Sequence, residues 1–286
     1  MNQTSEHKRG LLAVFIAAVL WSSGGLFIKL ISLDAMQLSF FRAGIAAITF
    51  ALIFRKRILL INKFTLINSI FYSLVLISFV IATKTTTAAN AIFLQATAPI
   101  YVLIFEPLIN KTKYEKSNII TVAVCFIGML FFFIGELEPG HLEGNLVALF
   151  SGIMFAAFFL GMKKNDIKHQ QSSIFFGNVL VTIISIPFIL SLDTISLDDL
   201  WMLGYLGVFQ IAIAYAFFAS GLKRVFAVEA SIISMIEPVL NPVWVFFGYG
   251  EVPSFWAIIG GIIIISAILV KTLVTGSSIF KKKFSY

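Results

Sequence analysis

The sequence predicts an all-helical integral membrane protein with ten transmembrane helices. Of its 286 residues, 59% are apolar and only 12% are charged, and the mean hydropathy is +0.98. A soluble domain averages about 25% charged residues, so this chain has too little charge to cover a water-exposed surface. Ten spans of about 20 residues each use most of the chain. They leave short loops and no room for a soluble catalytic domain.

Ten apolar segments, bounded by charged residues, Pro or Gly, approach the length that a bilayer requires. They cover residues 10–30, 36–54, 65–83, 87–108, 117–134, 144–162, 173–191, 200–221, 227–248 and 255–274. The first segment follows Lys8-Arg9 and lacks a small-residue cleavage site before the next span. We therefore expect it to stay in the protein as the first helix and not to be a cleaved signal peptide.

The distribution of basic residues predicts that both termini are cytoplasmic. With ten spans, all Lys and Arg residues except Lys29, Arg42 and Lys84 fall on the side of the two termini. Basic residues concentrate on the cytoplasmic side of membrane proteins. The net charge of +7 therefore indicates topology. It does not indicate a nucleic-acid partner, which would require a basic patch on a folded surface.

The two halves of the chain repeat one another. Shifts of 134 to 139 residues superpose Lys29 on Lys163, Lys84 on Lys223 and Pro99 on Pro238. We expect two five-helix repeats, residues 1–143 and 144–286, and the odd number of crossings inverts the second. Inverted repeats with interrupted helices at matching places indicate a transporter with its site near the middle of the membrane. The alternative is an old duplication that is kept only for packing.

Pro99 and Pro238 each lie near the middle of a predicted span. A proline removes one helical hydrogen bond and kinks the helix. The freed carbonyl can face a cavity, or a neighbouring Ser or Thr can satisfy it. We expect both prolines to act as hinges.

Glu237 lies about ten residues into the ninth span, where an acidic side chain costs about 2.5–3.5 kcal/mol on insertion scales. Such residues face a bundle interior and serve ion or substrate pathways. Helical spacing places Asn241 and Trp244 on the same face. Glu237 can therefore carry a proton or pair with a substrate amine. The alternative is a structural Glu paired with a basic residue such as Arg42.

Further candidate substrate-binding residues lie in other spans: Asn90, Thr97 and Tyr101, which stack on one face of the fourth span, and Gln210, Trp21 and Arg42. Polar residues in a span can bind a ligand or join helices. Trp residues can line a cavity or anchor the protein at the membrane surface. Arg42 can bind a carboxylate through two hydrogen bonds, or its side chain can extend to the interface.

The sequence predicts no cofactor, no metal and no enzymatic activity. Its three His residues are not spaced as metal ligands, and a single Cys excludes an intrachain disulfide framework. No phosphate-binding Walker sequence and no nucleophile elbow is present, which argues against an ATP-driven pump. A membrane-embedded enzyme needs a clustered catalytic set, and the sequence offers none. A non-transporting membrane scaffold or sensor is the alternative from another class.

Several motifs resemble those of EamA-type carriers in the drug/metabolite transporter superfamily. They are Leu20-Trp21-Ser22-Ser23-Gly24, Phe40-Phe41-Arg42, Lys84-Thr85-Thr86-Thr87-Ala88-Ala89, Ile236-Glu237-Pro238-Val239, Gly250-Glu251-Val252-Pro253 and Gly260-Gly261. The resemblance spans nearly the whole chain and implies ten helices, a central cavity near Glu237 and Pro238, and alternating access for small metabolites, often amino acids leaving the cell. The chain departs from the family pattern after the fourth helix, where Asn110-Lys111 replaces the expected Gly-Glu.

Together these features predict a secondary transporter in the cytoplasmic membrane of a bacterium. We expect it to export an amino acid or a related small solute by alternating access. A sugar, nucleotide-sugar or drug transporter is the alternative, although nucleotide-sugar phosphates need basic groups in the cavity and only Arg42 qualifies. The expected partners are the small-molecule substrate, the lipid bilayer and protons. The sequence leaves open whether the protein is a monomer or a homodimer.

Overall fold

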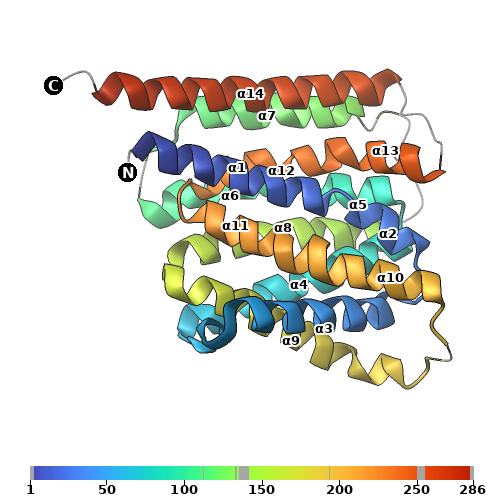
Figure 1. Cartoon of the computed structure of the whole chain (residues 1–286). Coiled ribbons are helices and arrows are strands. Elements are labelled where there is room, and N and C mark those ends of the chain that lie inside the picture. Colours follow the sequence, from blue (N-terminus) through green and yellow to red (C-terminus); the bar gives the residue numbers. More distant parts are fainter. Residues whose placement is uncertain are drawn as a thin grey trace.

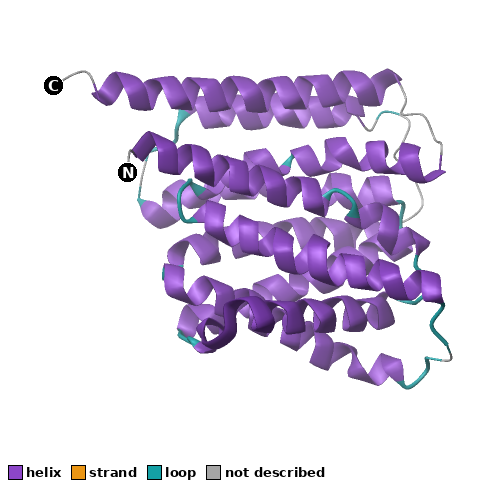
Figure 2. Ribbon diagram, in the orientation of Figure 1, coloured by secondary structure: helices purple, strands orange, loops and turns teal. Residues whose placement is uncertain are grey.

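The computed structural model describes residues 3–111, 113–132, 134, 142–192, 194–249 and 255–283. All regular structure within these residues is helical (Figure 2). The helices run roughly side by side in one bundle, and α7 and α14 form a pair along one side of it (Figure 1).

The first half of the chain contains α1 (Gln3–Trp21), α2 (Gly24–Leu30), α3 (Ala35–Phe54), η1 (Arg55–Leu59), α4 (Lys63–Thr85), α5 (Ala88–Gln95), α6 (Ala98–Asn110) and α7 (Lys116–Phe132). The second half contains α8 (Leu142–Lys164), η2 (Ile167–His169), α9 (Gln170–Ile189), α10 (Leu197–Tyr205), η3 (Leu206–Ile213), α11 (Ala214–Leu222), α12 (Ala227–Ser234), α13 (Ile236–Tyr249) and α14 (Phe255–Lys283). Unlike the short 3-10 turns η1 and η2, η3 is a π-helix.

Eight helical stretches of the described chain are long and apolar enough to cross a membrane. The described apolar parts of α7 and α14, Lys116–Phe131 and Ile258–Lys271, are shorter. Large apolar side chains such as Leu52, Ile183 and Phe247 are exposed on the outside of the bundle. Polar side chains such as Asn68 and Asn178 are fully buried inside it. This inversion of the usual surface suits a protein surrounded by lipid, where polar groups must be satisfied internally.

The helices of the two halves pack against one another in matched pairs. The contact of α1 with α11 corresponds to that of α8 with α4, and α3 packs on α9 as α7 packs on α14. If the two halves are exchanged, the α1–α11 contact becomes the α8–α4 contact. The α3–α9 and α7–α14 contacts each map onto themselves. Corresponding helices α1 and α8 run in opposite directions, because α8 ends at the end of the bundle where α1 begins (Figure 1).

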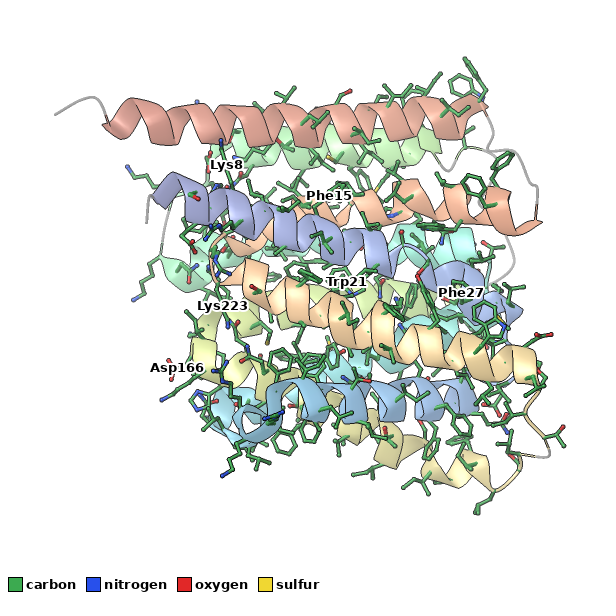
Figure 3. The ribbon with its side chains drawn as sticks, viewed as in Figure 1. Lys8, Phe15, Trp21, Phe27, Asp166 and Lys223 are labelled. Atoms are coloured by element: carbon green, nitrogen blue, oxygen red, sulfur yellow. The ribbon has the colours of Figure 1, made fainter. Side chains whose placement is uncertain are left out.

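We call the end of the bundle at which α1 begins the basic end, because Lys8 and Lys223 lie there (Figure 3). Phe27 lies toward the opposite end (Figure 3). The largest cluster of buried apolar residues lies between these ends and includes Trp21, Tyr72, Phe158 and Phe218. The core is therefore strongly aromatic at mid-height.

Two helix breaks follow from the predicted prolines. α5 ends at Gln95 and α12 ends at Ser234, in each case four residues before the proline. A proline ring clashes with the carbonyl of the residue four positions earlier and cannot donate a hydrogen bond to it. Each helix therefore stops there, and a new helix starts with the proline, Pro99 or Pro238, in its first turn.

A third break, between α1 and α2, was not predicted. It lies at Ser22 and Ser23, whose hydroxyls donate to the carbonyls of Val19 (2.6 Å) and Leu20 (2.9 Å). Such local bonds compete with the regular helical pattern and bend helices. The π-helix η3 is a further irregularity that the apolar pattern did not predict, and π segments frequently mark functional sites.

Candidate functional site

A small cavity lies where the two proline-associated breaks face one another. Gln95 and Pro99 line it from the first break, Ser234 and Glu237 from the second, and Phe155 of α8 closes one wall. Its volume is about 20 Å³, which is room for about one water molecule. A metabolite can enter this site only if the surrounding helices move apart.

Glu237 is only 9% exposed and lines this cavity. Among the described residues, its carboxyl group forms no hydrogen bond and no ion pair, although its charge interacts with that of Arg42. A buried charge without a close partner is costly. The carboxyl group is therefore suited to accept a proton or a cationic group of a ligand.

Arg42 is 4% exposed and lies inside the bundle. Its Nη2 donates to Oε1 of Gln210 at 2.6 Å, and Nε2 of Gln210 donates to the carbonyl of Trp21 at 3.4 Å. The alternative in which Arg42 extends to the membrane surface is therefore wrong. Gln210 lies in η3, so the π-helix carries the residue that holds the arginine.

Asn241 and Trp244 both bind the break between α1 and α2. Asn241 Nδ2 donates to the carbonyl of Ser22 at 3.0 Å, and Trp244 Nε1 donates to the hydroxyl of the same residue at 2.7 Å. Gly24 and Gly25 make room for this arrangement. A Cβ atom on Gly24 would lie 2.7 Å from Gln210 Nε2, and one on Gly25 would lie 2.8 Å from Asn241 Nδ2.

Trp21 lies in an aromatic cluster at the centre of the bundle. Its ring centroid lies 4.8 Å from that of Tyr215, 5.3 Å from that of Phe218 and 5.7 Å from that of Phe155. Its indole Nε1 is buried and has no hydrogen-bond partner in the described part of the chain. The side chain thus combines close packing with one unused donor, as in sites where an aromatic residue contacts a ligand.

The three candidates of the fourth span all face α8, but they do not meet at one site. Asn90 Nδ2 donates to Asn145 Oδ1 at 3.0 Å, and Thr97 Oγ1 donates to the carbonyl of Leu94 at 2.6 Å. Tyr101 lines a separate pocket between α4, α6 and α8. The predicted stacking assumed one straight helix, whereas the structure divides this span into α5 and α6 at Ala96.

Sequence reasoning missed Gln95 as a candidate, because the same straight-helix geometry placed it off the predicted face. In the structure Gln95 lines the central cavity, and its Nε2 donates to Ser151 Oγ at 2.7 Å. The usable signal was its position four residues before Pro99, where the proline ring weakens the helix.

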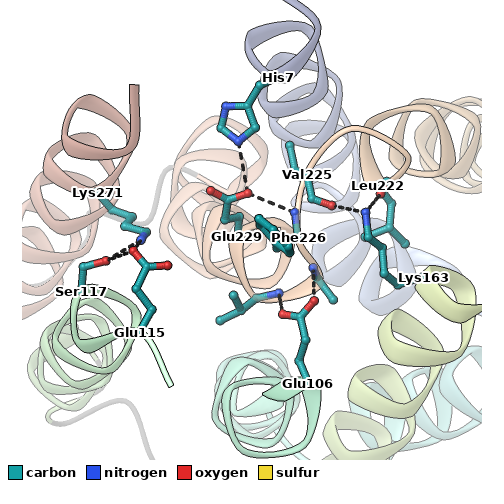
Figure 4. A network of polar contacts seen from close by, with 12 residues as sticks. His7, Glu106, Glu115, Ser117, Lys163, Leu222, Val225, Phe226, Glu229 and Lys271 are labelled. Carbon is teal, nitrogen blue, oxygen red and sulfur yellow. Dashed lines mark hydrogen bonds and ion pairs between the residues drawn. The ribbon is translucent and has the colours of Figure 1, made fainter. Parts of the chain in front are cut away.

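Polar contacts join the helices at the basic end of the bundle (Figure 4). The carboxylate of Glu106 accepts hydrogen bonds from the main-chain N–H groups of Ala227 (2.9 Å) and Val228 (2.8 Å), at the start of α12. Lys163 Nζ donates to the carbonyls of Leu222 (2.9 Å) and Val225 (2.6 Å). The turn between α11 and α12 is therefore held from both α6 and α8.

Two further pairs in Figure 4 join neighbouring helices at this end. His7 Nε2 lies 3.2 Å from Glu229 Oε2, and Lys271 Nζ lies 3.0 Å from Glu115 Oε1. Partial burial of Glu115 opposes ionisation, but hydrogen bonds from Ser117 and Lys271 outweigh it and lower its pKa below the usual 4.5. Glu115 is thus ionised at neutral pH and ties α7 to α14.

The opposite end carries matching contacts. Lys29 Nζ donates to the carbonyl of Thr86 at 2.8 Å, and Lys84 Nζ donates to the carbonyl of Ile31 at 2.6 Å. Lys29 is the repeat partner of Lys163, and Thr86 falls on Val225 under the shift of 139 residues. Each end of the site is therefore held by a lysine from one half. The sequence match at Gly250-Glu251-Val252-Pro253 lies outside the described residues.

The EamA-like transporter family matches this chain twice, over residues 8–134 and 142–273. An uncharacterized transporter of Archaeoglobus fulgidus is 26% identical over 91% of this chain and 95% of its own length. The pseudopaline exporter CntI of Pseudomonas aeruginosa strain UCBPP-PA14 is 22% identical over 91% of this chain and 94% of its own. Human solute carrier family 35 member G1 is 23% identical over 90% of this chain and 77% of its own.

A protein of known crystal structure has the same fold. It aligns with a TM-score of 0.79 over 94% of this chain and 98% of its own length, at 16% identity. The apolar helices, the two family matches and the named relatives together identify a multi-pass membrane transporter, and they point away from an enzyme. This chain belongs to the EamA-like transporter family.

Proposed function

We propose that the protein is a secondary transporter that exports an amino acid or a related small solute across the cytoplasmic membrane of a bacterium. The observation that carries this proposal is Glu237, a buried carboxyl group without a close partner, in a cavity between two helix breaks. Interrupted helices with a site between inverted halves are the arrangement of many secondary transporters. In this proposal the ten helical segments cross the membrane and the basic end faces the cytoplasm.

In the proposed cycle, the repeats 1–143 and 144–286 rock against one another about Pro99 and Pro238. Opening either end exposes Glu237, which takes up a proton or the ammonium group of the substrate. Gln95 and Ser234 supply hydrogen-bonding groups on the two sides of the cavity. The aromatic wall at Phe155 suits an amphipathic solute.

One observation favours this substrate class over a nucleotide sugar. Phosphate groups require basic partners, and Arg42, the single basic candidate from the sequence, already donates to Gln210. The relative CntI is named as an exporter, which supports the proposed direction.

The test is flux of labelled amino acids in proteoliposomes, with and without a pH gradient. We expect saturable flux that responds to the gradient, and we expect Glu237→Gln to abolish that response. Glu143→Gln is the matched control, because Glu143 is exposed at the start of α8. Saturable flux that does not respond to the gradient, in the unmodified protein and in Glu237→Gln alike, would refute the proton role. The protein would still be a carrier. Absence of flux for amino acids, but not for sugars or drugs, would refute the substrate class.

A further inference from the structure

A second and larger cavity lies on the side of the bundle, between α4, α6 and α8. Its volume is about 330 Å³, far larger than that of the central cavity. Phe64, Phe105 and Ile153 line it and are each more than one-third exposed. In a membrane, such exposed apolar walls face lipid. The cavity is therefore a groove that the bilayer can fill, and we call it the lateral groove.

The lateral groove contains a polar group that the protein leaves without a partner. Asn68 is 0% exposed, and neither Nδ2 nor Oδ1 of its amide has a hydrogen-bond partner among the residues that the structure describes. Gly161 lies directly against it, since a Cβ atom there would come within 1.9 Å of Asn68 Oδ1. Burial of an unpaired amide is unfavourable. The amide is thus available to a molecule that occupies the groove.

The polar and apolar parts of the groove are ordered along its length. Lys164 lies at the basic end, with Nζ 6.0 Å from the centroid of the Phe64 ring. Asn68 follows Phe64 by one helical turn, about 6 Å deeper. Beyond it lie the apolar residues Phe71 and Ile153. A cation, an amide donor and an apolar channel thus follow one another from the end of the bundle inward.

We propose that the lateral groove binds an anionic phospholipid of the leaflet at the basic end. Its phosphate contacts Lys164, an ester carbonyl accepts a hydrogen bond from Asn68 Nδ2, and one acyl chain fills the apolar part of the groove. A phospholipid carries these three groups in the same order and at similar depths. Basic pockets between membrane helices are known to bind anionic headgroups. This inference does not depend on the proposed substrate or on Glu237.

The test is native mass spectrometry of the detergent-purified protein, titrated with phosphatidylglycerol or with phosphatidylethanolamine of the same chain length. We expect Lys164→Gln to weaken phosphatidylglycerol binding about fivefold and phosphatidylethanolamine binding less, because the ammonium group of that lipid offsets the charge of its phosphate. Asn68→Leu should weaken both lipids about fivefold, because both carry the ester carbonyl. Ala157→Phe should block both, since Ala157 lines the groove. Lys168→Gln is the control, an exposed lysine at the same end that does not line the groove.

Three results would overturn the proposal. Lipid binding by Lys164→Gln and Asn68→Leu equal to that of Lys168→Gln would place any bound lipid elsewhere. Full competition by inorganic phosphate would mean that the groove recognises a free anion. A dimer peak that disappears in Ala157→Phe would mean that a second copy covers the groove. If Ala157→Phe fails to fold, the other two variants still decide, because one changes an exposed lysine and the other removes an unpaired amide.

Discussion

Arg42 and an ionised Glu237 have opposite charges inside the bundle, close enough to interact, yet no ion pair joins them. Arg42 is held by Gln210, whereas Glu237 lines the cavity without a hydrogen bond to any described residue. The arginine can therefore lower the free energy of an ionised Glu237 without forming a direct bond to its carboxylate. A direct ion pair would compete with a ligand, and this separation leaves the carboxyl group free.

A double-mutant cycle tests this charge coupling. Arg42→Gln leaves any charge on Glu237 unbalanced and removes a bond to Gln210, so we expect a loss of about 2–4 kcal/mol in unfolding free energy. We expect Glu237→Gln to change stability by less, and the double variant to be more stable than the sum of the single effects predicts. Denaturation in detergent at neutral pH measures all four proteins. Strict additivity would show that the two charges do not interact.

The neighbours of Gly25 leave no room for a larger residue at this position. A Cβ atom there would lie 2.8 Å from Asn241 Nδ2 and 3.0 Å from Ile92 Cδ1. Gly25→Ala should therefore displace Asn241 from Ser22 and cost about 1–3 kcal/mol. Gly204→Ala is the matched control, because no atom lies within 4 Å of its Cβ position; there we expect no loss and a gain of up to about 1 kcal/mol. Equal melting temperatures for the two variants would contradict this account of the break.

The helix breaks are the features of single elements that create the site. Pro107 shows that a proline alone does not suffice, since α6 continues through it. Pro99 and Pro238 instead occupy the first turn of a new helix, at matching places in the two halves. A break can change its angle with little loss of hydrogen bonding, because the proline there donates no hydrogen bond to the preceding turn. The two breaks are therefore the natural flexing points of the bundle.

Replacement of these prolines should slow transport without unfolding the protein. In Pro99→Ala or Pro238→Ala the helix can continue through the break, which favours one rigid conformation. We expect the turnover rate to fall by about tenfold or more while stability is retained or increased. Pro107→Ala is the control on the same helix as Pro99, and its turnover should match that of the unmodified protein. Loss of turnover in all three variants would assign the effect to helix packing in general.

The elements differ in how far the sequence predicts them. A helix lies in each of the ten predicted ranges, because apolar length is a strong signal in lipid. The breaks before Pro99 and Pro238 follow from the chemistry of the proline ring. The break at Ser22 depends on local hydroxyl bonds and on the amide of Asn241, which is distant in sequence. The π-helix at Gln210 likewise arises in packing that apolar periodicity does not encode.

For the candidate site, the sequence predicted the residue types better than their grouping. Glu237 was recognisable because an acid within a span is rare and costly. Tyr101 was assigned to the central site, yet it lines the lateral groove, in the part of the span that follows the break at Ala96. Asn241 and Trp244 do share one region, but both bind the main chain or hydroxyl of Ser22. Their placement depends on contacts between the two halves.

Across the whole molecule, the internal symmetry gives the two ends of the bundle a matching lysine contact. Lys163 binds the turn before α12 at the basic end, and its repeat partner Lys29 binds the turn before α5 at the opposite end. The central cavity, with a volume of about 20 Å³, lies between them. An inverted repeat in which either lysine contact can break alone has two equivalent ways to open. Alternating access then requires that the two contacts release at different times.

Weakening one lysine contact should therefore open one end of the site selectively. We expect Lys163→Gln to expose the cavity from the basic end and Lys29→Gln from the opposite end, since each variant loses a charge-assisted hydrogen bond worth about 1.5–3 kcal/mol. A cysteine at Ser234, which lines the cavity, reports access through its reaction with a membrane-impermeant thiol reagent in vesicles of either orientation.

The native Cys125 is fully buried, and the parent protein without Ser234→Cys measures the background labelling of Cys125. Labelling should rise about tenfold from the side that the basic end faces for Lys163→Gln and from the other side for Lys29→Gln. Lys56→Gln, an exposed lysine at η1, should change neither. Increased labelling from the same side in both lysine variants would contradict the symmetric mechanism, because chemically equivalent contacts at opposite ends cannot open the same path.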